Sequence, residues 1–210
     1  MLCAYQSDLE IINPDPVCGK FTDIDTTMWY HNGVHYCIEN GLMGGTGNNQ
    51  FSPNVTMIRS SLAMILWVRQ GVPYSPAEMP FADVMEGTYY RNAVKWCYEK
   101  GLMAGTSNNT FSPNMALTRE QVVVIFYKYA CLLNIKHAKR TPLEGFPDND
   151  SVAGWARDAF SWALSYGIIS GAFDGTHVCL APQLECSRAQ VAVMLMRFAD
   201  MQEHKCELEE

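Results

Sequence analysis

The sequence of 210 residues has no cluster of basic residues, no long apolar run and no pair of cysteines at a Cys-x-x-Cys spacing. Its formal net charge is −7. An acidic chain without clustered lysine and arginine is a poor candidate for a nucleic-acid binder, because such binding depends on neutralising phosphates. No apolar stretch approaches the roughly 18 residues that a membrane-spanning helix requires. We therefore expect a globular protein that binds no nucleic acid and has no membrane span.

The first twenty residues lack the features of a signal peptide. No basic region precedes a continuous apolar stretch, since acidic residues and prolines interrupt the segment. We therefore expect no export signal in residues 1–20.

The chain also lacks the motifs of common catalytic sites. It has no Gly-x-Ser-x-Gly, no P-loop and no His-Glu-x-x-His sequence. It contains eight cysteines, but a chain of more than about 100 residues needs no disulfide framework. Cys179 and Cys186 flank one loop and could form a disulfide after export, a point that the sequence leaves open. We predict no catalytic site and no cofactor.

What the chain does contain is an internal repeat of four ordered markers. A Phe-x-Asp sequence comes first, then a glycine segment, then Phe-Ser-Pro or its degenerate form Leu-Ala-Pro, and last an arginine before an apolar periodic run. The markers begin at Phe21, Gly41, Phe51 and Arg59, at Phe81, Gly101, Phe111 and Arg119, and at Phe146, Gly167, Leu180 and Arg188. Repeat three is longer, mostly around residues 173–180. The predicted boundaries are an N-terminal segment 1–20, repeats 21–75, 81–134 and 146–203, and a tail 204–210.

Each repeat is predicted to form a helix, a glycine loop and a second helix. The first helix ends at Gly41, Gly101 or Gly167, because glycine readily adopts the left-handed conformation of a helix end. The second helix begins at a capping box in residues 118–121 and 187–190, a hydroxyl followed three residues later by glutamine. Repeat one lacks the hydroxyl, so its second helix should fray or be capped in another way. Cys37 and Cys97 lie on the apolar face of the first helix and are predicted to be buried thiols.

These markers resemble the S-layer homology family over about residues 21–200. Its units carry a Phe-x-Asp opening, a tryptophan-bearing helix, a glycine turn, an Asn-Gly-Thr-Phe-x-Pro-like loop and a Thr-Arg-Ala-Glu-like helix start. The resemblance implies an all-α fold of three tandem helix–loop–helix repeats in a pseudo-threefold assembly, with grooves between the repeats. It also implies non-catalytic binding to secondary cell-wall polysaccharide, often through a pyruvate ketal, at the surface of a bacterium and as part of a larger exported cargo protein.

The candidate ligand-binding residues repeat at equivalent positions. An arginine at the start of a helix opposes the helix dipole, which makes sense if the free amides of the first turn and the guanidinium together bind a carboxylate. Aromatic faces could stack on the sugar, and glycines would let the backbone approach it closely. The candidates are Arg59, Arg119, Arg188, Trp29, Tyr89, Trp155, Asp23, Asp83, Asp148, Gly45, Gly105 and Gly171. Arg119 begins the most complete repeat, and we expect Arg119→Ala to weaken binding while leaving stability nearly unchanged.

Structural interpretations remain open beside these. The arginines could pair with acids across repeats. On helical spacing alone the three aromatic residues belong in the core, and the aspartates cap the turns that follow them. The three glycines serve either turn geometry or ligand approach. His31 and His35 are spaced like metal ligands on a helix, but no third ligand repeats near them, so we predict no metal site. The competing functions are a helical repeat scaffold that binds protein and an enzyme, for which these two histidines form the only asymmetric polar pair.

Overall fold

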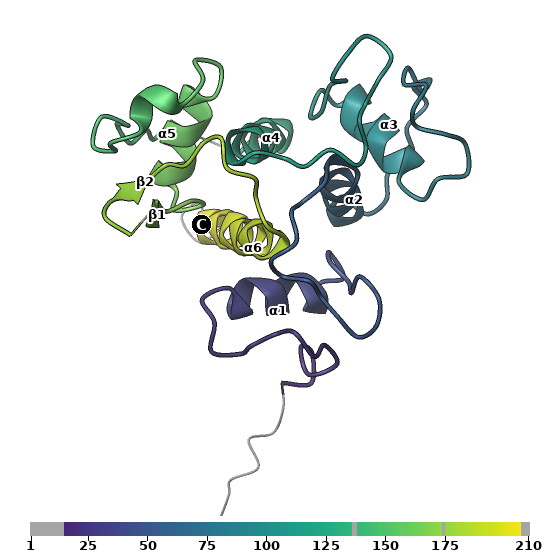
Figure 1. Ribbon diagram of the computed structural model, residues 1–210. Coiled ribbons are helices and arrows are strands. Elements are labelled where there is room, and N and C mark those ends of the chain that lie inside the picture. Colours follow the sequence, from purple (N-terminus) through teal and green to yellow (C-terminus); the bar gives the residue numbers. More distant parts are fainter. Residues whose placement is uncertain (1–14, 136–137, 174, 207–210) are drawn as a thin grey trace, which may run out of the picture.

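The computed structural model describes residues 15–135, 138–173 and 175–206, and its regular elements are helices apart from one hairpin of two two-residue strands (Figure 1). The elements are α1 (His31–Glu39), α2 (Arg59–Arg69), α3 (Arg91–Glu99), α4 (Arg119–Leu132), a 3-10 helix (Asn149–Ser151), α5 (Arg157–Ser165), β1 (Ala172–Phe173), β2 (Val178–Cys179) and α6 (Arg188–Cys206). The hairpin falls in the longer third repeat, where Ala172 pairs with Cys179. Within the described ranges, none of the helices has the length and apolar character needed to cross a membrane. The predicted all-α fold is confirmed.

Three lobes surround the centre of the molecule, and each lobe combines helices of two repeats. Figure 1 shows α2, α4 and α6 near the centre. Each of them packs against the first helix of the following repeat: α2 against α3, α4 against α5, and α6 against α1. The two helices of one sequence repeat therefore do not form a packed pair with each other. Because α6 of the last repeat packs on α1 of the first, the assembly closes on itself.

The contacts between paired helices are close. A Cβ atom on Gly33 of α1 would lie 2.6 Å from the Cα atom of Val193 in α6, so only glycine allows this crossing. The thiols of Cys37 and Cys97 are fully buried in the equivalent interfaces. They donate to main-chain carbonyls of the partner helix, 3.7 Å away at Ala192 and 3.8 Å away at Ala63. The predicted burial of both thiols is confirmed.

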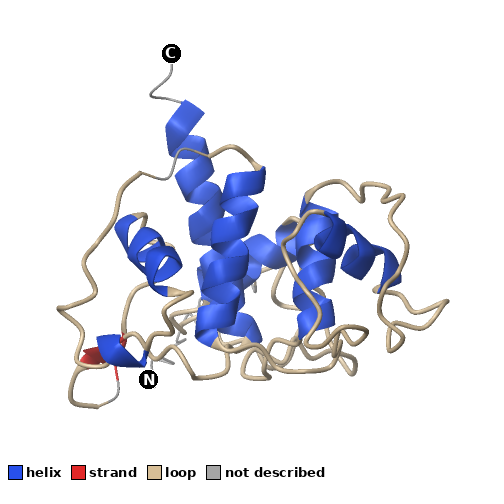
Figure 2. Ribbon diagram, turned by 90° about the horizontal axis from the view of Figure 1, so that it is seen from above, coloured by secondary structure: helices blue, strands red, loops and turns tan. Residues whose placement is uncertain are grey.

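A cyclic set of backbone hydrogen bonds marks the pseudo-threefold axis. The amide of Met57 donates to the carbonyl of Cys186 at 2.7 Å, that of Leu117 to Met57 at 2.9 Å, and that of Cys186 to Leu117 at 2.9 Å. These three residues hold the same place in the three repeats, two positions before the helix-start arginine. Figure 2 shows many of the connecting loops gathered at the end of the assembly opposite the C-terminal end of α6. Cys186 is a buried free thiol, so it does not form a disulfide with Cys179.

The helix ends follow the local sequence signals. Gly41, Gly101 and Gly167 follow the first helices with φ of 64°, 68° and 67°. Thr118 and Gln121 form a reciprocal capping box at the start of α4. Ile58 gives α2 no side-chain cap, but the amide of Arg59 donates to the carbonyl of Met115 in repeat two at 3.0 Å. The helix start that lacks a hydroxyl is thus capped by the neighbouring repeat.

Candidate functional site

The helix-start arginines reach into the loop of the following repeat. The Arg59 guanidinium donates through Nε to the carbonyl of Phe111 at 2.8 Å and through Nη2 to that of Ala104 at 2.5 Å. Its carbon Cζ lies 4.4 Å from the centre of the Phe111 ring. Arg188 makes the same pair of bonds to Phe51 and Gly44, at 3.0 and 2.7 Å. An acid across repeats was the alternative partner left open above, and the structure shows backbone carbonyls instead.

Whereas Arg188 is half-buried, Arg119 begins α4 and is buried like Arg59. Its exposed fraction is 6%, against 7% for Arg59, and its Nη2 donates to the carbonyl of Ser170 at 2.6 Å. The prediction that Arg119→Ala leaves stability nearly unchanged suits an exposed side chain, and the structure shows a buried one. The sequence placed this arginine at a helix start, but the start is covered by repeat three.

The first-turn amides of the central helices are not free for an anion. The amides of Arg59 and Ser60 donate to Met115 and Pro113 of repeat two. The equivalent amides of α4 donate to Leu184 and Pro182, and those of α6 to Val55 and Pro53. The predicted use of these amides as a carboxylate site is wrong, because the loop of the next repeat occupies each helix start. Any anion must be bound by side chains.

The repeated aspartates hold the loops that receive the arginines. Asp83 accepts hydrogen bonds from the amides of Phe111 at 2.8 Å and Ser112 at 2.7 Å, one on each carboxylate oxygen. Asp23 and Asp148 make the same two bonds at the same distances within their own repeats. They cap a loop that lies 28 to 33 residues further along, not the turn that follows them. Each aspartate therefore positions the carbonyl-bearing loop on which an arginine docks.

Replacing Asp83 by asparagine is expected to lower the free energy of unfolding by about 2 kcal/mol. Asparagine keeps one acceptor, loses the charge and turns an N–H group toward a backbone amide, and a hydrogen bond to a charged group is worth about 1.5–3 kcal/mol. Urea denaturation followed by circular dichroism measures the loss. Asp25→Asn is the control, because the exposed Asp25 carboxylate bonds to Thr27 and to no other described residue. An equal effect in both variants would refute the role of Asp83.

Gly45, Gly105 and Gly171 serve packing inside their own repeats. A Cβ atom on Gly105 would lie 2.6 Å from the ring of Phe81 and 2.5 Å from the carbonyl oxygen of Ser107. On Gly45 it would meet Phe21 at the same distance, and on Gly171 it would meet Val178. Their φ angles are not positive. Neither turn geometry nor ligand approach, the two interpretations left open above, is needed to explain these glycines.

The three repeated aromatic residues are exposed, so their expected place in the core is wrong. The exposed fractions are 62% for Trp29, 70% for Tyr89 and 60% for Trp155. The helices begin two residues later, so helical spacing does not apply to these positions. Each residue precedes the helix start, and Trp29 and Tyr89 make edge contacts with the following tyrosine. Three large aromatic side chains at equivalent exposed positions are not explained by folding.

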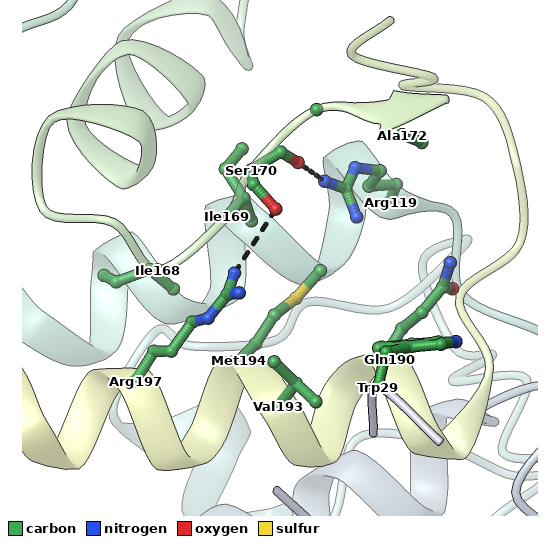
Figure 3. Close-up of a pocket in the computed structure, with 11 residues that line it drawn as sticks. Trp29, Arg119, Ile168, Ile169, Ser170, Ala172, Gln190, Val193, Met194 and Arg197 are labelled. Atoms are coloured by element: carbon green, nitrogen blue, oxygen red, sulfur yellow. Dashed lines mark hydrogen bonds between the residues drawn. The ribbon is translucent and has the colours of Figure 1, made fainter. Parts of the chain in front are cut away.

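A cavity of about 520 Å³ brings three of the candidates together (Figure 3). Trp29 comes from repeat one, Arg119 from repeat two and Gly171 from repeat three. The floor is formed by the glycine loop of repeat three and by α6. The described residues that line it are Trp29, Arg119, Ile168, Ile169, Ser170, Gly171, Ala172, Gln190, Val193, Met194 and Arg197. The site is thus composed across repeats, as the grooves of the predicted assembly require.

Two guanidinium groups converge on one residue of this cavity. Figure 3 shows Arg119 bonded to the carbonyl of Ser170 and Arg197, from α6, directed at the hydroxyl of the same residue. The described lining residues include no carboxylate. Burial lowers the pKa of Arg119, and the nearby charge of Arg197 adds to this effect. Cys186 and the Asp148 carboxylate raise the pKa of Arg119, and an anion bound here would act in the same direction.

Arg119 is also less fully bonded by the protein than its two counterparts. Its buried Nε has no oxygen or nitrogen acceptor among the described residues, whereas Arg59 and Arg188 use theirs on the carbonyls of phenylalanines. Repeat three has Leu180 at that position and the β1–β2 hairpin in the preceding loop. This difference makes Arg119 the arginine best suited to a ligand.

Sequence reasoning missed Arg197 and Ser170. Arg197 falls where the other central helices have Val68 and Lys128, so it does not belong to the repeated pattern. A search along each second helix for basic residues that do not recur in all three repeats would have found it. Ser170 could not have been found, because only the fold places its carbonyl beside Arg119.

Comparison with known proteins decides the family. The model of the S-layer homology domain matches residues 20–63, 80–123 and 145–192, which is more than half of the chain. The chain belongs to the S-layer homology domain family. The three matches coincide with the three repeats of the sequence, and domains of this family anchor proteins at the cell surface.

Several curated proteins are similar to this S-layer homology chain. An amylopullulanase of Thermoanaerobacterium thermosulfurigenes is 25% identical over 83% of the chain and 9% of its own length. The exoglucanase XynX of Acetivibrio thermocellus is 25% identical over 83% of the chain and 16% of its length. The surface-layer 125 kDa protein of Lysinibacillus sphaericus is 26% identical over 78% of the chain and 13% of its length. The chain therefore spans less than a fifth of each, and the family and the surface-layer relative point to the cell surface or cell wall.

Proposed function

We propose that this chain is a non-catalytic anchoring unit that binds anionic secondary cell-wall polysaccharide through a pyruvylated sugar. The observation that carries the proposal is the cavity in which exposed Trp29 stands with Arg119 and Arg197, without a carboxylate among its described lining residues. A ketal carboxylate accepts hydrogen bonds from guanidinium groups, and an aromatic face packs against the C–H face of a sugar ring. The cargo is a larger protein of which these repeats form a part.

The cavity suits a charged sugar better than a catalytic reaction. Its polar groups are two arginines, the Ser170 hydroxyl and the Gln190 amide, and none of these is a general base or an activated nucleophile. A local positive charge in a chain of net charge −7 favours a ligand that is anionic at one point over one that is anionic throughout. One carboxylate on an otherwise neutral glycan meets that condition.

A protein-binding scaffold is the second candidate. Val55, Met115 and Leu184 occupy equivalent positions near the pseudo-threefold axis, and all three are exposed. They form an apolar triad away from the cavity, and such exposed groups are a common feature of protein interfaces. The triad gives this candidate one supporting observation, whereas the cavity combines charge, shape and an aromatic surface.

The deciding experiment is a pull-down on purified wall sacculi, with and without their secondary polysaccharide. We expect the chain to sediment with intact sacculi and to remain in solution after the polysaccharide has been stripped. Removing the ketal alone, by mild acid, should abolish most of the binding. Equal sedimentation with stripped sacculi would refute the proposal, and loss only after removal of wall protein would favour the scaffold.

Trp29→Ala is expected to weaken binding of a pyruvylated sugar about three- to tenfold, because an aromatic contact of this kind is worth roughly 0.5–1.5 kcal/mol. Isothermal titration calorimetry measures the change. Trp155→Ala is the matched control, since Trp155 has the same place and exposure in repeat three but does not line the cavity. If Trp155→Ala weakened binding as much as Trp29→Ala, the site would not be confined to this cavity.

A further inference from the structure

The segment before the first repeat brings two more ligand-type side chains to the histidines of α1. His31 and His35 lie one turn apart on the helix, and Asp15 and Cys18 come from the turn that precedes Phe21. The Asp15 Oδ2 atom lies 3.0 Å from His31 Nε2 and 2.7 Å from His35 Nδ1. The Cys18 Sγ atom lies 4.0 Å from the same His35 nitrogen. The sequence showed no third ligand beside these histidines, and the fold supplies two.

We propose that Asp15, Cys18, His31 and His35 bind one zinc ion. Their four donor atoms all lie within 4.8 Å of one another. Zinc forms bonds of about 2.0–2.3 Å to these atom types, which places the corners of a tetrahedral site roughly 3.3–3.8 Å apart. Small side-chain rotations suffice to reach that geometry. Imidazole nitrogen, thiolate and carboxylate together form a set of intermediate softness that suits zinc better than magnesium or calcium.

The carboxylate and one imidazole are already oriented for this role. Asp15 Oδ1 accepts hydrogen bonds from the amides of Val17 at 2.9 Å and Cys18 at 3.2 Å, which leaves Oδ2 facing the imidazoles. On the far side of His35, its Nε2 lies 3.7 Å from a carboxylate oxygen of Glu39. A carboxylate at the second nitrogen of a ligating histidine fixes the ring and raises its basicity.

The surroundings allow an ion to enter. A cavity of about 490 Å³ is lined by Asp15, His31, His35 and Glu39 among others. The two imidazoles are 19% and 33% exposed, whereas Cys18 is 1% exposed. Burial, with a contribution from Asp15, raises the pKa of the Cys18 thiol to about 12. That thiol is no nucleophile at neutral pH, and a metal ion must displace its proton.

The cluster is specific to repeat one. The equivalent positions hold Ser75, Glu78, Arg91 and Lys95 in repeat two, and Arg140, Leu143, Arg157 and Ser161 in repeat three. Arg91 and Arg157 donate to carbonyls of their own repeats, at Val84 and Asn149. Buried Leu143 shows that packing alone needs only an apolar side chain at the Cys18 position. Nothing in the shared fold requires a thiol, two imidazoles and a carboxylate at this place.

With four protein ligands the site is structural. It ties the turn at residues 15–20 to α1, in the lobe where α1 packs on α6 and closes the assembly. Zinc bound only by the folded state stabilises that state by mass action. At a free zinc concentration about a hundred times the dissociation constant, the melting temperature should rise by about 5–10 °C.

The test uses the whole chain, reduced, stripped of metal with a chelator and then dialysed against zinc. We expect one zinc per chain by plasma mass spectrometry, the rise in melting temperature, and a thiolate-to-cobalt charge-transfer band when cobalt(II) replaces zinc. Cys18→Ser should abolish the band, and His35→Asn should remove most of the bound zinc and of the thermal shift. His177→Asn, a change of histidine outside the cluster, should alter none of these.

Several outcomes would overturn the site. They are a chain that retains no zinc, a melting temperature that zinc leaves unchanged, and equal zinc content in His35→Asn and His177→Asn. His35 is partly exposed, so its variant decides the question even if Cys18→Ser does not fold. None of these measurements uses polysaccharide, so the result is independent of the proposed anchoring function.

Discussion

Replacing Arg59 by alanine is expected to lower the free energy of unfolding by about 3 kcal/mol. The guanidinium bonds to two carbonyls of repeat two and packs on the Phe111 ring. A hydrogen bond to a charged group is worth about 1.5–3 kcal/mol, and the buried carbonyls of Ala104 and Phe111 would lose their donor. In a chain of this length the melting temperature should fall by about 6–12 °C. Thermal unfolding followed by circular dichroism measures it.

The three helix-start arginines supply the controls for this prediction. Arg188→Ala should cost about as much as Arg59→Ala, because its two bonds are the same. Arg119→Ala should cost less, because among the described residues its guanidinium bonds to one carbonyl, that of Ser170, and otherwise to the Cys186 thiol, a weaker acceptor. Arg59→Lys should recover little stability, since one ammonium group cannot hold two carbonyls in a fixed plane. An equal loss of unfolding free energy in all three alanine variants would show that these contacts do not determine the loss.

Local features of the fold could be predicted from the sequence because their causes are local. Gly41 ends α1 since its left-handed φ suits glycine, and Thr118 with Gln121 caps α4 within four residues of chain. The threefold assembly followed from the repeated markers and the family resemblance. What could not be predicted was the pairing of helices, because each central helix packs on the next repeat and nothing in a repeat specifies that choice.

The site was harder to predict because its residues meet only after folding. Asp83 bonds to amides 28 residues away, and Arg59 reaches carbonyls about 50 residues away. Helical spacing assigned Trp29 to the first helix and hence to the core. In the structure Trp29 lies before that helix begins. Asp15 and Cys18 stand outside the repeat altogether, and a search for features shared by three repeats could not connect them with His31.

The buried residues of the repeated pattern stabilise the fold, and the exposed ones are those that we propose for binding. The aspartates and glycines shape the loop, and two arginines dock on it. The three aromatic residues are exposed, and packing in the fold does not explain their exposure. Repeat three then modifies the pattern, because among the described residues the Nε of Arg119 has no oxygen or nitrogen acceptor and α6 adds Arg197. The cavity that we propose as the ligand site thus lies where the contacts of the three repeats differ.

Arg119→Ala is expected to weaken binding of a pyruvylated sugar about ten- to a hundredfold. A carboxylate in the cavity would lose a charge-assisted hydrogen bond worth about 1.5–3 kcal/mol. Arg119→Lys should recover only part of the affinity, because lysine lacks the planar fork that grips two carboxylate oxygens. Calorimetric titration of each variant, at a temperature well below its melting transition, separates the loss of binding from any loss of fold.

The comparison with Arg59 makes this last prediction decisive. Arg59→Ala should destabilise the chain more than Arg119→Ala, yet it should weaken binding less, because Arg59 does not line the cavity and its donors are used by the protein. The variant with the larger loss of stability should therefore have the smaller loss of affinity. If affinity instead fell in proportion to stability across both, the arginines would act only through the fold. The carboxylate would then have to be bound by other groups, with Arg197 of the same cavity as the first residue to test.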